Sequence, residues 1–284
     1  MKNISAKKLI PCICGMCLAM ILIAVSCLVL GHGRPEKEGH HVVIFGDSII
    51  AYAQDETSVA NMLVRETGMD VFDLSFGGTQ MALSSDAETL GNKRNYLSMY
   101  SIAQSLYADD FTIQEHFFSQ DVASEYFEGR VAQLETLDLK NSDIVIIEHL
   151  LNDYHSSVPI TSDDGSEYTY TGALAAVVSY IRSVNPDIRI IILSPTKKWL
   201  LNGPEAGEID NGGGTLNTYL AAQEKAAENL GVEYLDITGI YDEEYVTPEG
   251  EVITGYGYTV DGTHPNYYGR MAISRRLAEY LGES

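Results

Sequence analysis

Two widely separated motifs carry side chains suited to nucleophilic catalysis. Ser48 ends the tripeptide Gly-Asp-Ser after an apolar run, and Asp261 precedes His264 by three residues near the C-terminus. A serine hydroxyl is a weak nucleophile until an imidazole takes its proton, and a carboxylate fixes the tautomer of that imidazole. The same motifs also fit a turn and a helix N-terminal cap, and Asp47 is expected to support the turn.

Hydrogen-bond donors for an oxyanion follow two other predicted strands. The Gly77-Gly78 turn can present backbone N–H groups, and the side chain of Asn152 carries an amide. Acyl transfer requires such donors at its tetrahedral intermediate. Each feature also has an ordinary explanation, a tight turn and an Asx-type cap, so their joint occurrence at strand ends is the stronger observation. His149 is expected to line the pocket rather than to act as the base, because the Asp-x-x-His motif already supplies one.

An alternation of strand and helix patterns would bring these residues together. Short runs rich in Val and Ile predict strands, and longer periodic stretches predict helices. The predicted strands cover residues 41–48, 71–74, 143–148, 188–193 and 232–237. The predicted helices cover residues 51–67, 122–137, 172–183, 215–230 and 265–281. This pattern predicts an α/β fold with a parallel sheet of about five strands and helices on both faces, in which the motifs meet at the carboxyl edge.

Residues 41–284 are predicted to form one domain, because the sequence shows no internal repeat and no change of composition. The segment 80–121 is aromatic and irregular, and the segments 161–171 and 194–214 are predicted loops. A net charge of −22 argues against a nucleic-acid partner, which would require a basic face. The acidic residues are spread along the chain, which indicates a solubilising surface.

The N-terminal segment differs from the rest of the chain. Residues 1–8 carry three lysines and are expected to stay in the cytoplasm, and residues 9–31 form an uncharged apolar stretch long enough to span a bilayer. We rank an uncleaved transmembrane signal anchor first, a cleaved signal peptide second, and a lipoprotein signal ending at Cys27 third. Residues 32–40 are a polar linker. The domain is therefore expected outside the cytoplasm, held at the cell membrane or secreted.

All four cysteines lie within the apolar stretch 9–31. The spacing of Cys12, Cys14 and Cys17 resembles a metal motif, but no His or acidic residue lies nearby, so we expect no metal site there. The expected exported domain contains no cysteine and needs no disulfide at its size.

Taken together, the motifs resemble the SGNH hydrolases, also called GDSL esterases and lipases. The resemblance rests on Gly-Asp-Ser, a Gly after the second strand, Asn-Asp after the third, and Asp-x-x-His near the end. It implies a flavodoxin-like, three-layer α/β/α fold, with Ser48 as nucleophile, His264 as base and Asp261 as its orienting residue. It also implies an oxyanion hole built from the N–H groups of Ser48 and Gly78 and the amide of Asn152, with no metal or cofactor.

The sequence departs from the family pattern at two places. The second motif usually reads Asn-x-Gly-x-x-Gly, and here it is 73–78 Asp-Leu-Ser-Phe-Gly-Gly, so the choice of Gly78 over Gly77 rests on spacing. The third motif usually reads Gly-x-Asn-Asp, and here Leu150 replaces the Gly.

The expected function is hydrolysis of a carboxylic ester, with a short acyl group such as acetyl on a small molecule or an acylated surface glycan. The first alternative is an O-acyltransferase that uses the same acyl-enzyme on a surface polysaccharide. The second is a catalytically silent glycan-binding module, against which the complete set of catalytic residue types argues.

Overall fold

A five-stranded parallel sheet forms the centre of the domain in the computed structural model, which describes residues 38–84, 93–118 and 125–282. The strand order is β2-β1-β3-β4-β5. The strands are β1 (Val42–Gly46), β2 (Val71–Asp73), β3 (Ile144–Glu148), β4 (Arg189–Leu193) and β5 (Glu233–Leu235). This order is that of the flavodoxin-like α/β folds, so the predicted α/β fold with a parallel sheet of five strands is confirmed.

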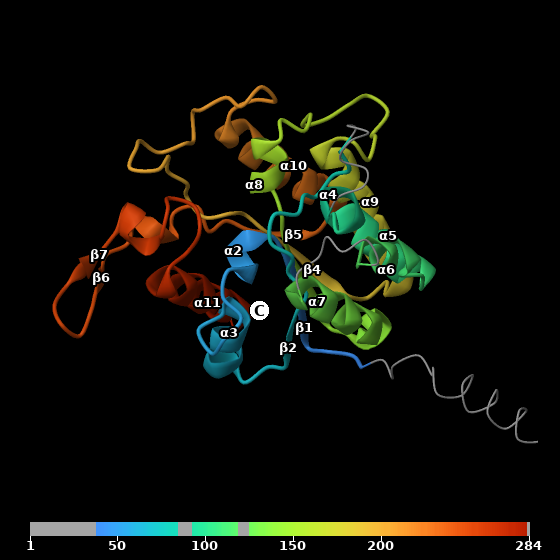
Figure 1. The fold of residues 1–284 in the computed structure, drawn as a ribbon, viewed down its shortest axis with the longest axis horizontal. Coiled ribbons are helices and arrows are strands. Elements are labelled where there is room, and N and C mark those ends of the chain that lie inside the picture. Colours follow the sequence, from blue (N-terminus) through green and yellow to red (C-terminus); the bar gives the residue numbers. More distant parts are fainter. Residues whose placement is uncertain (1–37, 85–92, 119–124, 283–284) are drawn as a thin grey trace, which may run out of the picture. The chain divides into compact units, whose positions relative to one another are not determined.

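Helices cover both faces of the sheet (Figure 1). Helices α3 (Val59–Thr67) and α11 (Tyr267–Gly282) pack together on one side, and α5 (Met99–Ala108) and α9 (Tyr170–Val184) pack together on the other. Helix α10 (Leu216–Leu230) contacts α9 and β5. The remaining helices are α2 (Ser48–Ala51), α4 (Lys93–Tyr96), α6 (Thr112–Phe118), α7 (Glu125–Thr136) and α8 (Leu151–His155), with single 3₁₀ turns at Leu139–Asn141, Ile240–Asp242 and Gly255–Tyr258.

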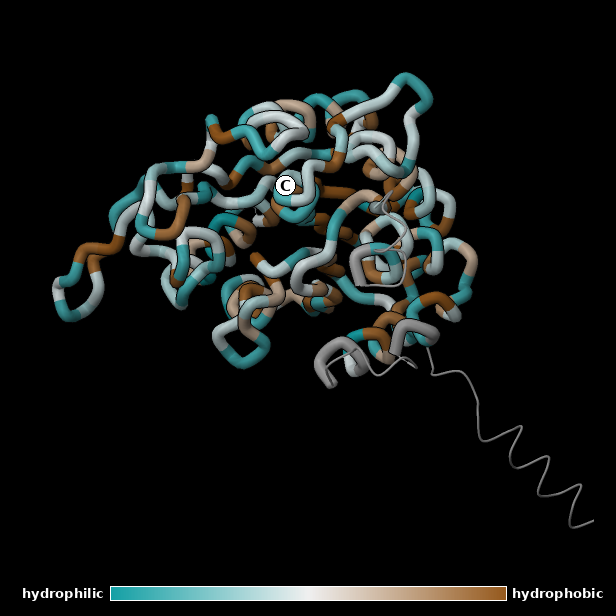
Figure 2. The backbone as a smooth tube through the Cα atoms, turned by 45° about the horizontal axis from the view of Figure 1, so that its top comes forward, coloured by the Kyte–Doolittle hydropathy of each residue, from teal (hydrophilic) through white to brown (hydrophobic). Residues whose placement is uncertain are grey.

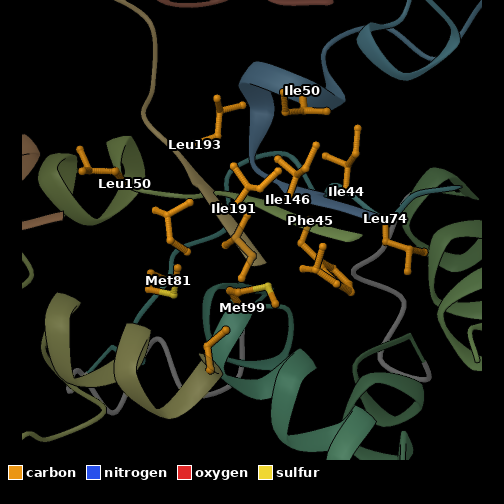
Figure 3. Packing of buried hydrophobic residues seen from close by; sticks show 14 of the residues in the cluster. Ile44, Phe45, Ile50, Leu74, Met81, Met99, Ile146, Leu150, Ile191 and Leu193 are labelled. Atoms are coloured by element: carbon orange, nitrogen blue, oxygen red, sulfur yellow. The ribbon is translucent and has the colours of Figure 1, made fainter. Parts of the chain in front are cut away.

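The apolar run of β1 is explained by burial on both faces of the sheet. All five residues of the strand are buried. Figure 3 shows Ile44 on the side of Ile50 and Phe45 on the side of Met99, because successive side chains of a strand point to opposite faces. Hydrophobic positions gather in the interior of the domain, and most peripheral loops are hydrophilic (Figure 2).

The register of the central strands positions the site. Gly46 of β1 pairs with Glu148 of β3, so both strands end at the same level. The residues that follow them emerge side by side at the carboxyl edge, where an open α/β sheet forms its ligand sites.

Three parts of the structure differ from the prediction. The predicted helix 51–67 begins only at Val59, as α3, because the side chain of Ser58 caps the helix start there. The segment 80–121, predicted as irregular, contains α4, α5 and α6, and this prediction was wrong. A short antiparallel hairpin, β6 (Tyr245–Val246) with β7 (Val252–Ile253), was not predicted.

The predicted segments 1–8 and 9–31 lie outside the described residues, as do the four cysteines. Within residues 38–84, 93–118 and 125–282, no helix has the length and apolar character needed to cross a membrane. The end of the predicted linker 32–40 is attached to the domain, since Glu38 bridges Leu137 and the ring of His40 stacks on Phe72.

Candidate active site

Ser48, His264 and Asp261 form a continuous chain of hydrogen bonds. The Nε2 atom of His264 lies 3.0 Å from Ser48 Oγ, and its Nδ1 atom lies 2.7 Å from Asp261 Oδ2. Ser48 and His264 are 216 residues apart in the chain. A nucleophile bonded to an imidazole that is bonded to a carboxylate is the arrangement required for activating a serine.

Ser48 is held at the turn between β1 and α2. The side chain of Asp47 caps this turn, accepting a hydrogen bond from Ile49 N at 2.9 Å. Gly46 is needed here for space, because a Cβ at this position would lie 2.7 Å from Ile50 Cγ1 and 3.0 Å from Ser75 Oγ. The predicted supporting role of Asp47 agrees with this geometry.

A tight turn before α11 brings Asp261 and His264 together. Asp261 Oδ1 accepts hydrogen bonds from Thr263 N at 3.0 Å and His264 N at 2.8 Å, which leaves Oδ2 for the imidazole. Asp261 therefore makes the turn contact and the imidazole contact at once. The ring of Tyr52 stacks on His264 at a centroid distance of 5.0 Å and so holds its plane.

The start of α11 was predicted two residues too early. The helix begins at Tyr267 rather than at Pro265. Asn266 Oδ1 accepts from Tyr268 N at 2.9 Å and from Gly269 N at 3.1 Å, which is the bonding of an N-cap residue.

Hydrogen bonds to its carboxylate lower the pKa of Asp261. Desolvation by burial acts to raise its pKa, but the hydrogen bonds from the side chain and backbone of His264 and from Thr263 N outweigh it. The pKa of Asp261 is therefore lowered from its usual value, and the carboxylate is charged when His264 takes a proton.

Asn152 lies in the first turn of α8, directly after β3. Its Nδ2 atom donates to Asp47 Oδ2 at 2.9 Å. The amide nitrogen carries two hydrogens, and this bond uses one of them. Asp47 therefore sets the orientation of the amide that the sequence predicts as an oxyanion donor.

The Gly77-Gly78 turn lies against the nucleophile. A Cβ built on Gly77 would be 3.8 Å from Ser48 Cβ, and Gly78 adopts the left-handed conformation with a φ of 75°. The carboxylate of Asp153 fixes the segment that follows, since it accepts from Met81 N at 2.8 Å and Ala82 N at 3.0 Å. The turn thus lies beside Ser48.

Two buried carboxyl groups lie under this region. Burial raises the pKa of Asp47 to about 6, although hydrogen bonds from Ile49 N, Glu148 and Asn152 oppose the shift. Burial, followed by the negative charge of Asp47, raises the pKa of Glu148 well above its usual range. Two neighbouring carboxylates repel each other in a buried site, so the charged form of Glu148 is disfavoured beside Asp47.

His149 was predicted to line the pocket, but in the structure it is a core residue. It is 2% exposed, and its Nε2 atom lies 3.2 Å from Thr79 Oγ1. Burial lowers its pKa to about 3, so the ring is neutral at physiological pH. This agrees with the expectation that His149 is not the catalytic base.

No role was predicted for Glu148 or Asp153. Glu148 is an acidic residue at the end of a buried strand. Its position could have indicated a functional role, because acidic residues are almost never fully buried without a partner. Asp153 follows Asn152 directly, and its signal is the Asn-Asp dipeptide at a strand end.

Within the described ranges, no group of three or more His, Cys, Asp or Glu side chains gathers as metal ligands would.

The chain was compared with known families and structures. The model of the GDSL-like Lipase/Acylhydrolase family matches residues 44–272. A search of curated proteins finds no significant match.

Three solved structures show the same fold at low identity. A protein from Lactobacillus plantarum is 18% identical with a TM-score of 0.58, covering 89% of this chain and 99% of that chain. A possible lipase from Chitinophaga pinensis is 15% identical with a TM-score of 0.54, covering 85% and 97%. The periplasmic domain of a lipopolysaccharide acetyltransferase from Salmonella ser. Paratyphi A is 14% identical with a TM-score of 0.50, covering 89% and 87%.

The family match spans most of the chain and includes Ser48, Asn152, Asp261 and His264. The chain therefore belongs to the GDSL-like lipase/acylhydrolase family, the SGNH hydrolases, and is a serine hydrolase that acts on ester bonds.

Proposed function

We propose that the protein hydrolyses short-chain acyl esters, such as O-acetyl groups on surface glycans, through an acyl-Ser48 intermediate. The observation that carries the proposal is the hydrogen-bonded series from Ser48 through His264 to Asp261, at 3.0 and 2.7 Å. In the first step Ser48 Oγ attacks the acyl carbon while its proton passes to His264 Nε2. The C–O bond of the ester then breaks, and the alcohol leaves with that proton.

The tetrahedral intermediate carries a negative oxygen that must be stabilised. We assign this to the N–H groups of Ser48 and Gly78 and to the amide of Asn152. Water then attacks the acyl-enzyme, again through His264, and releases the carboxylic acid. The net reaction is ester and water to acid and alcohol, and it requires no metal or cofactor.

An O-acyltransferase is the second candidate. In that reaction a sugar hydroxyl replaces water as the acceptor and the acyl-enzyme is the same. The likeness of the fold to an acetyltransferase domain supports this candidate. A rise in acyl consumption when oligosaccharides are added would favour it over hydrolysis.

The test is release of p-nitrophenol from its acetate ester by the full chain. Ser48→Ala should abolish release, and Ser183→Ala, an exposed serine on α9, should leave it unchanged. Equal rates for wild type and Ser48→Ala would overturn the assignment.

An ester series of increasing chain length tests the acyl preference. The predicted loop 194–214 is mostly polar, but Leu200 and Leu201 are exposed on it, 42% and 71% respectively. Faster turnover of long-chain esters would contradict the short-chain proposal.

The proposed location outside the cytoplasm rests on the apolar segment 9–31 alone. Fractionation, with protease treatment of intact cells, should find the protein on membranes and accessible from outside. Mass spectrometry of the purified protein decides between an intact anchor and a cleaved signal.

A further inference from the structure

Lys198 lies against the turn that carries the catalytic histidine. It follows β4, the strand next to β3 in the sheet. Its Nζ atom donates to Thr263 Oγ1 at 2.5 Å, and Trp199 N donates to Gly262 O at 2.8 Å. Two neighbouring residues of this loop are therefore bonded to the turn between Asp261 and His264.

The ammonium group of Lys198 is partly buried without a counter-ion in contact. Within the ranges that the structure describes, no carboxylate oxygen lies within 4.0 Å of its Nζ atom. Lys197 differs, since it pairs with Asp242 at 2.8 Å and Glu205 at 3.6 Å. Desolvation lowers the pKa of Lys198, and the charge of Asp261 offsets part of the shift. A partly desolvated ammonium with donors to spare is suited to an anionic ligand.

We propose that Lys198 forms an anion-binding subsite beside the turn that carries His264, which takes a carboxylate or phosphate group carried by the ester substrate. This inference rests on the proposed ester hydrolysis and names its substrate class. In a chain of net charge −22, the positive charge of Lys198 offsets part of the repulsion that an acidic substrate would meet. Acidic sugars and phosphate-containing polymers both present such groups.

A purely structural role for Lys198 makes a different prediction. If its ammonium only holds the Asp261–His264 turn through Thr263, its loss should slow neutral and anionic esters equally. If it binds substrate, its loss should act selectively on anionic esters.

The test compares three acetate esters that differ in one substituent: para-acetoxybenzoate, para-acetoxyphenyl phosphate and the neutral para-acetoxybenzamide. Each kcat/KM is divided by the rate of uncatalysed hydrolysis, which corrects for the leaving group. Wild type should favour at least one anionic ester over the amide by about tenfold or more, the range of a hydrogen bond to a charged group. A preference for the phosphate ester or for the carboxylate ester identifies which anionic group the subsite binds.

Variants then distinguish substrate binding by Lys198 from a purely structural role. Lys198→Met should remove most of the anionic preference, and Lys198→Arg should retain more of it than Lys198→Met. Lys197→Met is the matched control and should leave the preference unchanged. A wild-type preference near one, or an equal loss on all three esters in Lys198→Met, would overturn the subsite.

Binding measurements keep this test independent of turnover. Calorimetry with Ser48→Ala should show tighter binding of the anionic esters than of the amide, and adding Lys198→Met should remove the difference. If wild type hydrolyses no ester, the proposed function fails while these binding data still decide on the subsite.

Discussion

The amide of Asn152 is bonded to the buried carboxylate of Asp47, with 2.9 Å between Nδ2 and Oδ2. Asp47 directly precedes the nucleophile and also caps the turn that carries it. One carboxylate thus positions Ser48 through the backbone and Asn152 through its side chain. Glu148 Oε2 accepts a hydrogen bond from Asp47 N at 3.4 Å, which extends this network to the end of β3.

Asp47 should contribute to catalysis through Asn152. Asn152→Ala should lower kcat by roughly 10²–10³-fold with little change in KM, the range for loss of one oxyanion donor. Asp47→Asn keeps the side-chain shape but cannot accept from both Ile49 and Asn152, and should lower kcat by about tenfold or more. The double variant should be little slower than Asn152→Ala, because both changes disable the same donor. Additive losses in steady-state kinetics would show that Asp47 acts by another route.

The raised pKa of Glu148 predicts how stability depends on pH. An acid whose pKa is higher in the folded than in the unfolded protein adds stability below its unfolded pKa, and this is lost as pH rises through its folded pKa. Glu148→Gln cannot ionise, so its free energy of unfolding should fall less than that of wild type as pH rises above about 5. Ionisation of Asp47, whose pKa is raised from 3.8 to about 6, also lowers the free energy of unfolding, by roughly 3 kcal/mol. This part of the decrease should remain in Glu148→Gln.

Urea denaturation across this pH range is the measurement. Glu224→Gln, at an exposed position on α10, should follow the wild-type curve. A Glu148→Gln curve parallel to that of wild type would show that Glu148 does not hold a proton in the folded protein.

Replacing Asp261 should separate catalysis from folding. Asp261→Asn can still accept from Thr263 N and His264 N, so the turn and the melting temperature should change little. The charge that stabilises protonated His264 is lost, and kcat should fall by up to roughly 10⁴-fold. Kinetics at neutral pH alongside thermal unfolding check both parts, and an unchanged kcat would remove Asp261 from the catalytic assignment.

Gly46→Ala should be destabilising, because the new Cβ would approach Ile50 to 2.7 Å and Ser75 to 3.0 Å. We expect a loss of about 1–3 kcal/mol, typical of overpacking, and reduced activity because Ser48 lies two residues away. Gly129→Ala is the matched control, since Gly129 lies in α7 with no heavy atom within 4 Å of a built Cβ. It should raise stability by about 0.5–1 kcal/mol through helix propensity. Chemical denaturation of both variants tests the contrast.

Much of the fold could be predicted because its signals are local. The buried strands read as apolar runs, and the alternation with helices identified a parallel sheet. The helices between residues 93 and 118 were missed because the aromatic residues there obscured a helical period. In α5 the buried residues Met99, Ile102, Ala103 and Leu106 follow that period, and Ser98 caps the helix. The cap and the period together were a usable signal.

The sequence alone determined the pairing of Asp261 with His264, since three residues of one tight turn connect them. It also placed Ser48, Gly78 and Asn152 after successive strands, because apolar runs mark where strands end. Only the tertiary structure decided that His264 reaches Ser48 across 216 residues, that Asp47 and Glu148 are buried, with Asp47 bonded to Asn152, and that His149 is a neutral core residue. Burial and desolvation depend on what packs above and below the sheet, and no pattern within a single segment specifies them.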